Sequence, residues 1–324
     1  MMKNNSFEEL AKVISGVKTI YIFTHIHMDG DALGSSAALC SALRKQGKEC
    51  HVIIEDKIPD NLLFLDKGYC RKDYSDLEGA DLSICVDCSD KSRFPKRGEL
   101  FDKGKITMCI DHHKTTEHIC DYNYIDSEAA ATGQLIYRLL EALKVNIDKE
   151  MGEAIFAAIT TDTGNFQYSN TSKETHEITA ALYDAGIEAN KVSVELYEKV
   201  RIERLRIENR ALGTLKTYCD GKVAIAHVTQ KMLEETGALM EETEGVVQIL
   251  RSISGVEVAV FLKEINSHLI KASMRSKTIV DVAEIAAEFS GGGHSRAAGC
   301  TFNTSIEEAH RILVKRITDS LENL

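Results

Sequence analysis

Residues 19–46 read TIYIFTHIHMDGDALGSSAALCSALRKQ, and this stretch decides the fold class. Its first five residues, Thr19–Phe23, are apolar or β-branched, which is typical of a buried strand. Residues 32–46 then place apolar side chains at helical spacing, and Gly47 is a common stop signal. A polar turn rich in histidine and aspartate joins the two segments. The stretch therefore predicts a strand, a turn and a helix, the unit from which parallel α/β sheets are built.

The alternation of strand-like and helix-like segments continues through the first half of the chain. Beyond the opening stretch, strands are expected at residues 50–54, 81–86 and 106–110, and helices at 129–144, 149–160 and 172–185. Strands that alternate with helices in this way predict a mostly parallel sheet flanked by helices. The fold class is therefore α/β.

The second half predicts a smaller α/β domain. Its expected elements are a strand at Val223–Val228, a helical region to residue 252, strands at 256–265 and 268–274 close enough to pair as a hairpin, and helices at 280–289 and 305–321. Residues 190–212 are charged and contain neither glycine nor proline, which favours a helical linker. We therefore expect a first domain at 1–189, a linker at 190–212 and a second domain at 213–324.

The composition argues against several classes of protein. The chain has 324 residues and a formal net charge of −11, so a general basic surface for long nucleic acid is not expected. It has no run of about 18 apolar residues, and its first residues lack the apolar segment of a signal peptide. The nine cysteines are scattered through hydrophobic segments, which favours a reducing compartment. We therefore expect a cytoplasmic protein without a membrane partner.

Acidic residues and histidines gather where the predicted strands end, and the carboxyl ends of parallel strands share one edge of a sheet. The residues delivered there, including one after the helix at 149–160, are His25, Asp29, Asp31, Asp87, Asp111, His112, His113 and Asp162. Taken alone, Asp31 or Asp87 reads as an ordinary helix N-cap. Together, so many ionisable groups repel one another unless cations neutralise them. The set predicts a metal site.

The types of ligand indicate the metal. Carboxylates with imidazoles and no convincing set of thiolates suit Mn²⁺ or Mg²⁺, with Fe²⁺ or Co²⁺ as alternatives, rather than structural zinc. Four or more carboxylates are too many for one ion, so two ions that share a bridging aspartate fit better. Such centres, with ions about 3.5–4 Å apart, stabilise the attacking and leaving oxygens of phosphoryl displacement.

The second half carries a complementary signal for an anion. Consecutive glycines let backbone N–H groups approach an anion closely, and nearby basic side chains add donors. The candidate residues are Gly291, Gly292, Gly293, His294 and Arg296, with Arg275 at the end of a predicted strand. Each also has a simpler interpretation, because glycine runs form flexible loops and a lone arginine at a strand end is usually a solvated charge.

Taken together and in this order, the motifs resemble the DHH phosphoesterase family, in the branch with a DHH-associated C-terminal domain. Within it the nearest resemblance is to bacterial nanoRNases (oligoribonucleases) that are also 3′-phosphoadenosine 5′-phosphate phosphatases. The motifs are His25-x-x-x-Asp29-x-Asp31, Asp87, Asp111-His112-His113, Asp162-Thr163-Gly164 and Gly291-Gly292-Gly293-His294. The family commonly has proline where Met28 stands, a change that removes no ligand.

The resemblance implies a role for each residue. His25 and Asp29 would hold one metal, Asp87 would bridge two, and the residues of the second metal would be Asp31, His112 and Asp162. Asp111 would orient the adjacent imidazoles, and His113 would act as an acid or donor at the scissile phosphate. The groups that bind substrate from across an interdomain cleft would be Gly291, Gly292, Gly293, His294, Arg275 and Arg296. The expected cofactors are two divalent ions, Mn²⁺ first, with Mg²⁺ or Co²⁺ as alternatives.

The resemblance also implies the reaction. The first domain would be a DHH catalytic domain and the second a substrate-binding one. The enzyme would hydrolyse very short oligoribonucleotides to mononucleotides, and 3′-phosphoadenosine 5′-phosphate to AMP, by metal-assisted hydrolysis. The net charge of −11 and the 6% aromatic content speak against long strands. The alternatives are a cyclic di-AMP or linear dinucleotide (pApA) phosphodiesterase, and a non-catalytic nucleotide-binding protein. A homodimer is compatible with the resemblance.

Overall fold

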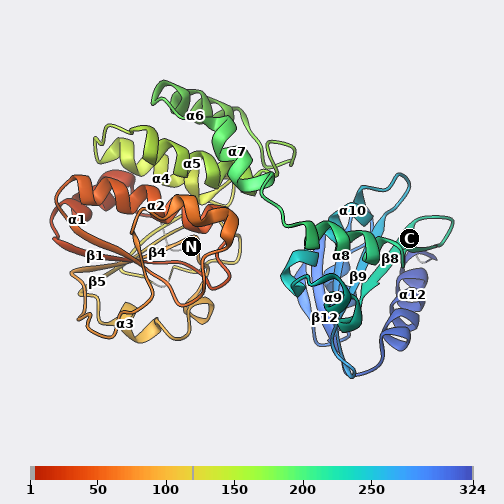
Figure 1. Ribbon diagram of the computed structural model, residues 1–324. Helices are drawn as coiled ribbons and strands as arrows, with labels where there is room; N and C mark the ends of the chain where they lie inside the picture. Colours follow the sequence, from red (N-terminus) through yellow and green to blue (C-terminus); the bar gives the residue numbers. More distant parts are fainter. Residues whose placement is uncertain (1–3, 119, 323–324) are drawn as a thin grey trace. The chain divides into compact units, whose positions relative to one another are not determined.

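The computed structural model describes residues 4–118 and 120–322 (Figure 1). The chain divides into two compact units, Met1–Lys199 and Val200–Leu324. Each unit has its own sheet and its own buried core. The α/β fold class expected from the sequence is confirmed.

The described residues of the first unit form a six-stranded sheet in the order β3-β2-β1-β4-β5-β6, and its pairings are parallel. The strands are β1 (Thr19–Phe23), β2 (Glu49–Ile53), β3 (Cys70–Arg71), β4 (Leu82–Val86), β5 (Ile106–Asp111) and β6 (Tyr122–Ile125). The predicted parallel sheet is confirmed. The sequence did not predict β3 and β6, which span only 2 and 4 residues and carry little periodic signal.

Helices cover both faces of this sheet. They are α1 (Phe7–Ser15), α2 (Gly30–Lys45), α3 (Gly98–Asp102), α4 (Thr132–Ala142), α5 (Lys149–Asp162), α6 (Lys173–Asp184) and α7 (Ala189–Tyr197), with 3-10 turns η1 (Asp60–Leu65) and η2 (Lys91–Arg93). In Figure 1, α2, α4 and α5 lie on one face and α3 lies on the other.

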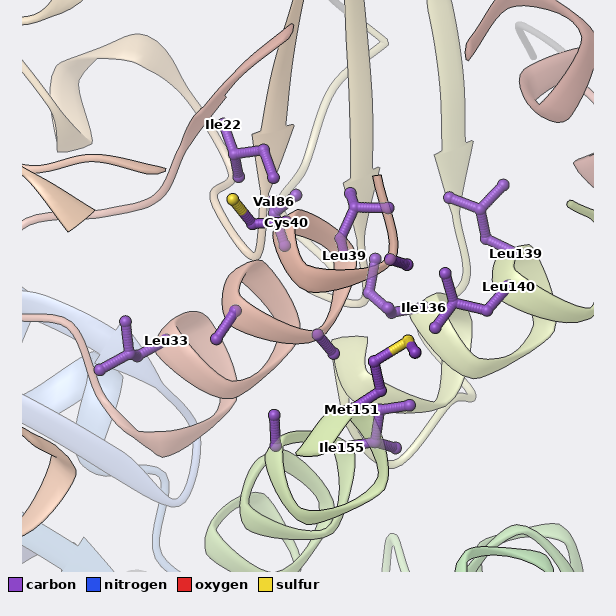
Figure 2. Packing of buried hydrophobic residues seen from close by; sticks show 14 of the residues in the cluster. Ile22, Leu33, Leu39, Cys40, Val86, Ile136, Leu139, Leu140, Met151 and Ile155 are labelled. Carbon is purple, nitrogen blue, oxygen red and sulfur yellow. The ribbon is translucent and has the colours of Figure 1, made fainter. Parts of the chain in front are cut away.

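The strands contribute to two cores because successive side chains of a strand point to opposite faces. Ile20 and Ile22 of β1 join the core beneath α1, α2, α4 and α5, whereas Tyr21 and Phe23 join the core beneath α3. The side chains that meet in the larger core in Figure 2 are Ile22, Val86, Leu39, Cys40, Ile136, Met151 and Ile155. Burying each large apolar side chain contributes about 1.5–3 kcal/mol, so this core anchors the strand ends.

A glycine in α2 sets the distance between α2 and α5. A Cβ added at Gly34 would lie 2.5 Å from the carbonyl oxygen of Ala154 and 3.0 Å from the backbone nitrogen of Ala158. Only glycine allows the two helix backbones to approach this closely. The close approach draws the C-terminal end of α5, with Asp162, toward the N-terminal end of α2.

The described residues of the second unit form a mixed sheet in the order β11-β12-β10-β9-β8-β7. The strands are β7 (Lys216–Tyr218), β8 (Val223–Val228), β9 (Val258–Asn266), β10 (Leu269–Ser276), β11 (Gly292–His294) and β12 (Ala297–Phe302). Strands β8 and β9 pair in parallel, and the other pairings are antiparallel. The predicted hairpin is confirmed as β9 and β10.

Helices also cover both faces of the second sheet. Helices α11 (Val282–Ala287) and α12 (Ile306–Glu322) contribute to the core on one face. The core on the other face contains residues of α8 (Ile202–Leu212), α9 (Gln230–Thr236) and α10 (Val246–Ser252), and the 3-10 turn η3 is Met240–Thr243.

Two local predictions differ from the structure. The stretch 190–212, expected to be one helical linker, lies in two helices, and the boundary between the units falls between α7 and α8. Each helix buries apolar residues in its own unit, Val192 and Leu196 in the first and Ile207 and Ala211 in the second. Packing has therefore overridden a continuous helical propensity. The glycine run, for which a flexible loop was the simpler interpretation, lies in a short hairpin of β11 and β12.

Among the described residues, no helix has both the length and the apolar character needed to cross a membrane. All nine cysteines are free thiols.

Candidate metal centre

The order of the strands places the candidate residues at one point of the first sheet. From β1, the chain adds β2 and β3 on one side and then β4, β5 and β6 on the other. The direction of winding thus reverses between β1 and β4. In parallel sheets such a point opens a crevice at the carboxyl ends of the strands, where ligands bind. The segments that follow β1, β4 and β5 are the ones that carry the predicted residues.

The first group of candidate ligands surrounds His25. Its Nε2 atom lies 3.9 Å from Oδ2 of Asp29 and 3.6 Å from Oδ2 of Asp87. The three potential ligand atoms lie within 4.8 Å of one another. The structure therefore brings together the residues predicted for one metal position and for the bridge.

The second group surrounds His112. Its Nε2 atom lies 3.7 Å from Oδ2 of Asp31 and 3.3 Å from Oδ2 of Asp162. The same atom lies 3.6 Å from Oδ1 of Asp87. Asp87 thus presents one oxygen to each imidazole, which is the arrangement expected of an aspartate between two metal positions. The residues predicted for the second position lie together as well.

The imidazoles are oriented as metal ligands. Nδ1 of His25 lies 2.7 Å from the carbonyl oxygen of Ile26, and Nδ1 of His112 lies 3.2 Å from that of Ala129. A carbonyl only accepts, so Nδ1 carries a proton and, in the neutral ring, Nε2 presents a lone pair to the aspartates. Lone pair and carboxylate repel each other unless a cation lies between them. Two ligands at about 2.1 Å from one ion would be at most about 4.2 Å apart, and the observed separations of 3.3–3.9 Å fall within that limit.

The N-terminal end of α4 holds two buried aspartates, Asp31 and Asp87. Oδ2 of Asp31 accepts from the backbone N–H of Thr132 at 2.7 Å, and its Oδ1 accepts from that of Gly133 at 2.9 Å. The hydroxyl of Thr132 donates to Oδ1 of Asp87 at 2.9 Å, and Ser35 donates to Asp31. The partial positive charge of a helix N-terminus favours these carboxylates. The sequence analysis did not single out Thr132 and Gly133. The change from the alanines 129–131 to Thr132-Gly133, where α4 begins, was the signal that could have found them.

Local backbone geometry aims two further aspartates. Asp87 has a φ of 53°, an uncommon value for a residue other than glycine, at the point where β4 ends. Asp29 is the N-cap of α2, and its Oδ1 accepts from the N–H of Ala32 at 3.0 Å. Asp31, which alone read as an N-cap, lies instead in the first turn of α2. Gly30 between them is necessary, because a Cβ there would lie 2.5 Å from the side chain of Thr161.

The aspartates of the two groups are difficult to ionise at the same time. Burial raises the pKa of Asp31 well above its ordinary value, and the charges of Asp87 and Asp162 add to this shift. Burial and the charge of Asp87 raise the pKa of Asp29, and burial raises that of Asp162 to about 6. Burial opposes the ionisation of Asp87 too, but when the surrounding histidines are protonated, their hydrogen bond and positive charges hold its pKa below the ordinary value. The donor set therefore fits divalent cations, which would neutralise this charge.

His113 differs from the other two imidazoles. Its Nδ1 donates to Oδ1 of Asp111 at 2.7 Å, and this hydrogen bond raises the pKa of His113 to about 9. Asp111 is buried and also accepts from the hydroxyl of Thr116. Nδ1 of His113 also lies 3.7 Å from Oδ1 of Asp87, but its hydrogen bond to Asp111 removes it as a ligand atom. His113 is thus a half-exposed imidazolium at neutral pH, suited to an anion.

In the second unit, strand register brings two of the predicted anion-binding residues into one row. His294 of β11 and Arg275 of β10 both pair with Ala297 of β12. Directly opposed residues of antiparallel strands share a face, so these two side chains flank the small Ala297 on one face of the sheet. Arg296 lies in the two-residue turn of the hairpin, where its guanidinium donates to the carbonyl of Val280 at 2.8 Å.

The three glycines of the hairpin differ in the space around them. A Cβ at Gly291 would lie 2.2 Å from the carbonyl oxygen of Gly299, and one at Gly293 would lie 2.4 Å from that of Ala297. Gly293 also has a φ of +145°. A Cβ at Gly292 would meet nothing within 4 Å. The pairing of β11 with β12 therefore requires Gly291 and Gly293.

Both units match models of known domain families. The model of the DHH family, N-terminal domain, matches residues 19–159, and that of the DHHA1 domain matches residues 220–323. A Thermus thermophilus protein named bifunctional oligoribonuclease and PAP phosphatase NrnA is 31% identical, over 97% of this chain and 93% of its own length. A Bacillus subtilis protein of the same name is 28% identical, over 94% of this chain and 96% of its own length.

A solved structure is similar over almost the whole chain. An exopolyphosphatase-related protein of Bacteroides fragilis is 29% identical with a TM-score of 0.89, and the match covers 98% of this chain and 95% of that protein. The matched domains and the near full-length relatives agree with the motifs that gather at the carboxyl ends of β1, β4 and β5. The chain belongs to the DHH family and carries a DHHA1 domain.

Proposed function

We propose that this protein is a metal-dependent phosphoesterase that hydrolyses very short oligoribonucleotides to mononucleotides and 3′-phosphoadenosine 5′-phosphate to AMP. The observation that carries the proposal is the position of Asp87, which presents one carboxylate oxygen to His25 and the other to His112. Two such ligand sets with a shared aspartate suit phosphoryl transfer. The names of the Thermus and Bacillus relatives supply the substrates.

Two divalent ions, with Mn²⁺ favoured, fit the two ligand sets. His25, Asp29 and Asp87 would hold one ion, and the residues that would hold the other are Asp31, His112, Asp162 and Asp87. When bound, such ions acidify a water for attack on phosphorus and neutralise charge on the phosphoryl oxygens. Mg²⁺ or Co²⁺ would suit the same carboxylate and imidazole ligands.

His113 would bind the scissile phosphate and donate a proton to it. It stays protonated at neutral pH because Asp111 accepts its Nδ1–H, which leaves Nε2–H to donate to an oxygen of the scissile phosphate. A charge-assisted hydrogen bond of this kind strengthens as negative charge develops on that oxygen. His113 also has the proton that a leaving oxygen requires.

The second unit would contribute to substrate binding. His294 and Arg275 lie in one row on one face of its sheet, and the adjacent hairpin supplies Arg296 and the glycines 291–293. Positively charged and N–H donor groups in a row suit a terminal phosphate, which short substrates present in high proportion. His294→Ala should therefore raise KM and leave metal binding unchanged.

A substrate panel tests the proposal. Manganese-loaded protein would be given RNAs of two to five nucleotides, 3′-phosphoadenosine 5′-phosphate, pApA, cyclic di-AMP and pyrophosphate. We expect fast hydrolysis of the shortest RNAs and release of AMP from 3′-phosphoadenosine 5′-phosphate. The Asp87→Ala variant should lose at least about 1,000-fold in kcat, whereas Asp102→Ala, a change at an exposed surface ion pair, should not.

Other outcomes would contradict the proposal in distinct ways. Turnover of cyclic di-AMP or pApA alone would assign a dinucleotide phosphodiesterase, and turnover of pyrophosphate alone would remove nucleotides from the function. Nucleotide binding without any hydrolysis would assign a non-catalytic protein. Gel filtration of the same preparation tests for a homodimer.

A further inference from the structure

The second unit contains a cavity that has no part in the function proposed above. It has a volume of about 630 Å³ and is lined by the edge strand β7, its neighbour β8 and helix α12. This volume falls within the range of about 300–1,000 Å³ that is typical of small-molecule sites. We call it the α12 groove; its lining residues are Lys216, Tyr218, His227, Ile306, Glu307, His310, Arg311, Val314 and Lys315.

The groove is separate from the anion-binding row within the same unit. Its strands β7 and β8 lie at one end of the sheet, where β7 is the edge strand, whereas β11 forms the opposite edge. It also uses the opposite face: His227 shares a face with Val223 and Ile225, which pack beneath α12, whereas Arg275 pairs with Ala259 on the other face. The groove is therefore a second location in this unit.

One face of α12 is turned toward the groove. The residues Glu307, His310, Arg311, Val314 and Lys315 recur at the spacing of a single helical stripe. The buried stripe of the same helix is Ile306, Ala309, Leu313 and Ile317, which anchors α12 on the sheet. Val314 of this stripe packs against the same core. The charged side chains of the stripe, Glu307, Arg311 and Lys315, are exposed and line the groove, which is the arrangement expected of a binding surface.

The groove is basic in a chain whose net charge is −11. It contains three basic side chains, Lys216, Arg311 and Lys315, against the single carboxylate of Glu307. Arg311 is paired with Glu308, but within the described part of the chain neither lysine forms an ion pair. Such a concentration of positive charge attracts an anion.

Aromatic and apolar groups lie beside the charges. The ring of Tyr218 packs edge-on against that of His310 at 5.7 Å between centroids, and its hydroxyl lies 3.0 Å from Nε2 of His310. Burial, together with the charge of Lys216, lowers the pKa of His310, which favours the neutral imidazole. Val314 and Ile306 add apolar surface. The groove thus offers planar and apolar contacts next to cationic ones.

We infer that the α12 groove binds a nucleoside 5′-phosphate, with Lys216 and Lys315 contacting the phosphate and Tyr218, His310 and Val314 contacting the nucleoside. The phosphate requires the unpaired ammonium groups, and a base has the flat apolar face that the tyrosine and histidine rings match. Either a free nucleotide or the 5′ end of an oligonucleotide carries this chemistry. The inference does not rest on the proposed hydrolysis.

Photo-cross-linking of the full chain tests this inference. The probe is 8-azido-AMP in the presence of a chelator, so that no metal-dependent hydrolysis occurs. We expect cross-links within residues 216–227 or 306–315. The double variant Lys216→Glu/Lys315→Glu should weaken AMP binding at the groove by at least about tenfold, because two charge contacts are lost.

A matched control separates a local effect from a general change of charge. Lys222→Glu/Lys231→Glu changes two exposed lysines of the same unit that are not in the groove, and its net charge equals that of the groove variant. It should keep the cross-links and change affinity by less than about twofold. Equal cross-linking in the two double variants, or no cross-link in the groove, would overturn the inference.

Competition identifies the part of the ligand that is recognised. Unlabelled AMP should compete with the probe. Adenosine alone or inorganic phosphate alone should reach the same competition only at a concentration at least about tenfold higher. Inorganic phosphate that competes as well as AMP would overturn the role of the nucleoside contacts. A 5′-phosphorylated dinucleotide that competes better than AMP would identify an oligonucleotide end as the source of the same chemistry.

Discussion

At the scale of single residues, two buried aspartates, Asp87 and Asp111, have different roles because they have different neighbours. Asp87 lies between two imidazoles whose Nε2 atoms face it, so its two oxygens are directed at two metal positions. Asp111 is equally buried, yet it accepts from Thr116 and from Nδ1 of His113. Asp87 is thus a candidate ligand, and Asp111 positions and charges a neighbouring imidazole.

Replacing Asp111 tests that positioning role. In metal-free protein we expect an NMR titration of His113 to give a pKa of about 9 in the wild type and a value closer to 6.5 in Asp111→Asn, because the carboxylate that stabilises the imidazolium is gone. The protonated form is lost as pH rises through the pKa, so the alkaline limb of kcat/KM should also move to lower pH.

A control and a contrary result are available for this titration. Asp121→Asn alters an aspartate that accepts from Thr107 instead, and it should leave the pKa of His113 near 9. An unchanged pKa in Asp111→Asn would show that Asp111 does not hold the proton on His113.

At the scale of elements, a buried arginine joins the ends of two strands. Arg97 donates to the carbonyl of Ile53 at 2.5 Å and to that of Thr24, next to His25, at 2.9 Å. It also lies 3.7 Å from Oε1 of Glu55, and the two side chains are 1% and 6% exposed. Arg97 therefore fixes the carboxyl ends of β1 and β2 beside the metal centre.

Removing this arginine should be costly. We expect Arg97→Met to lower the free energy of unfolding by about 3 kcal/mol, because it leaves the carboxylate of Glu55 buried without a cation. Arg97→Met/Glu55→Leu should recover part of the loss, since the stranded charge is also removed. Urea unfolding measures all variants together with Glu55→Leu. Strictly additive effects of the two single changes would contradict a coupled pair.

The hairpin of β11 and β12 allows a second test at this scale. Gly293→Ala should destabilise the hairpin by about 1–3 kcal/mol, because φ is +145° and the new Cβ would lie 2.4 Å from the carbonyl oxygen of Ala297. Gly292→Ala is the matched control, since its Cβ would meet nothing within 4 Å. Hydrogen exchange of residues 291–300 measures both. Equal protection in the two variants would show that the strand pairing does not require Gly293.

At the scale of the whole molecule, the six proposed metal ligands lie in the first unit, and metal should therefore stabilise that unit selectively. We expect Mn²⁺ to slow hydrogen exchange at the strand ends that carry His25, Asp87 and His112, and to leave the sheet of the second unit unchanged. Mass spectrometry with and without a chelator measures this. Equal protection of both sheets would contradict a centre confined to the first unit.

The sequence predicted much of this arrangement because strand ends are local features. Each buried strand of the parallel sheet is a short apolar run, and the residue after it falls at the binding edge, so Asp87 could be placed without coordinates. The hydrogen bond from the backbone N–H of Thr132 could not be predicted, because its acceptor, Asp31, lies 101 residues away in the sequence. The break between α7 and α8 also escaped prediction, because it follows from which core each helix joins rather than from helical propensity.

The proposed centre is tested most directly by anomalous diffraction at the manganese edge from crystals grown with Mn²⁺. We predict two peaks about 3.5–4 Å apart, one contacted by His25 and Asp29, the other by residues that include His112, and both by Asp87. A single peak, or two peaks that do not share Asp87, would contradict the account.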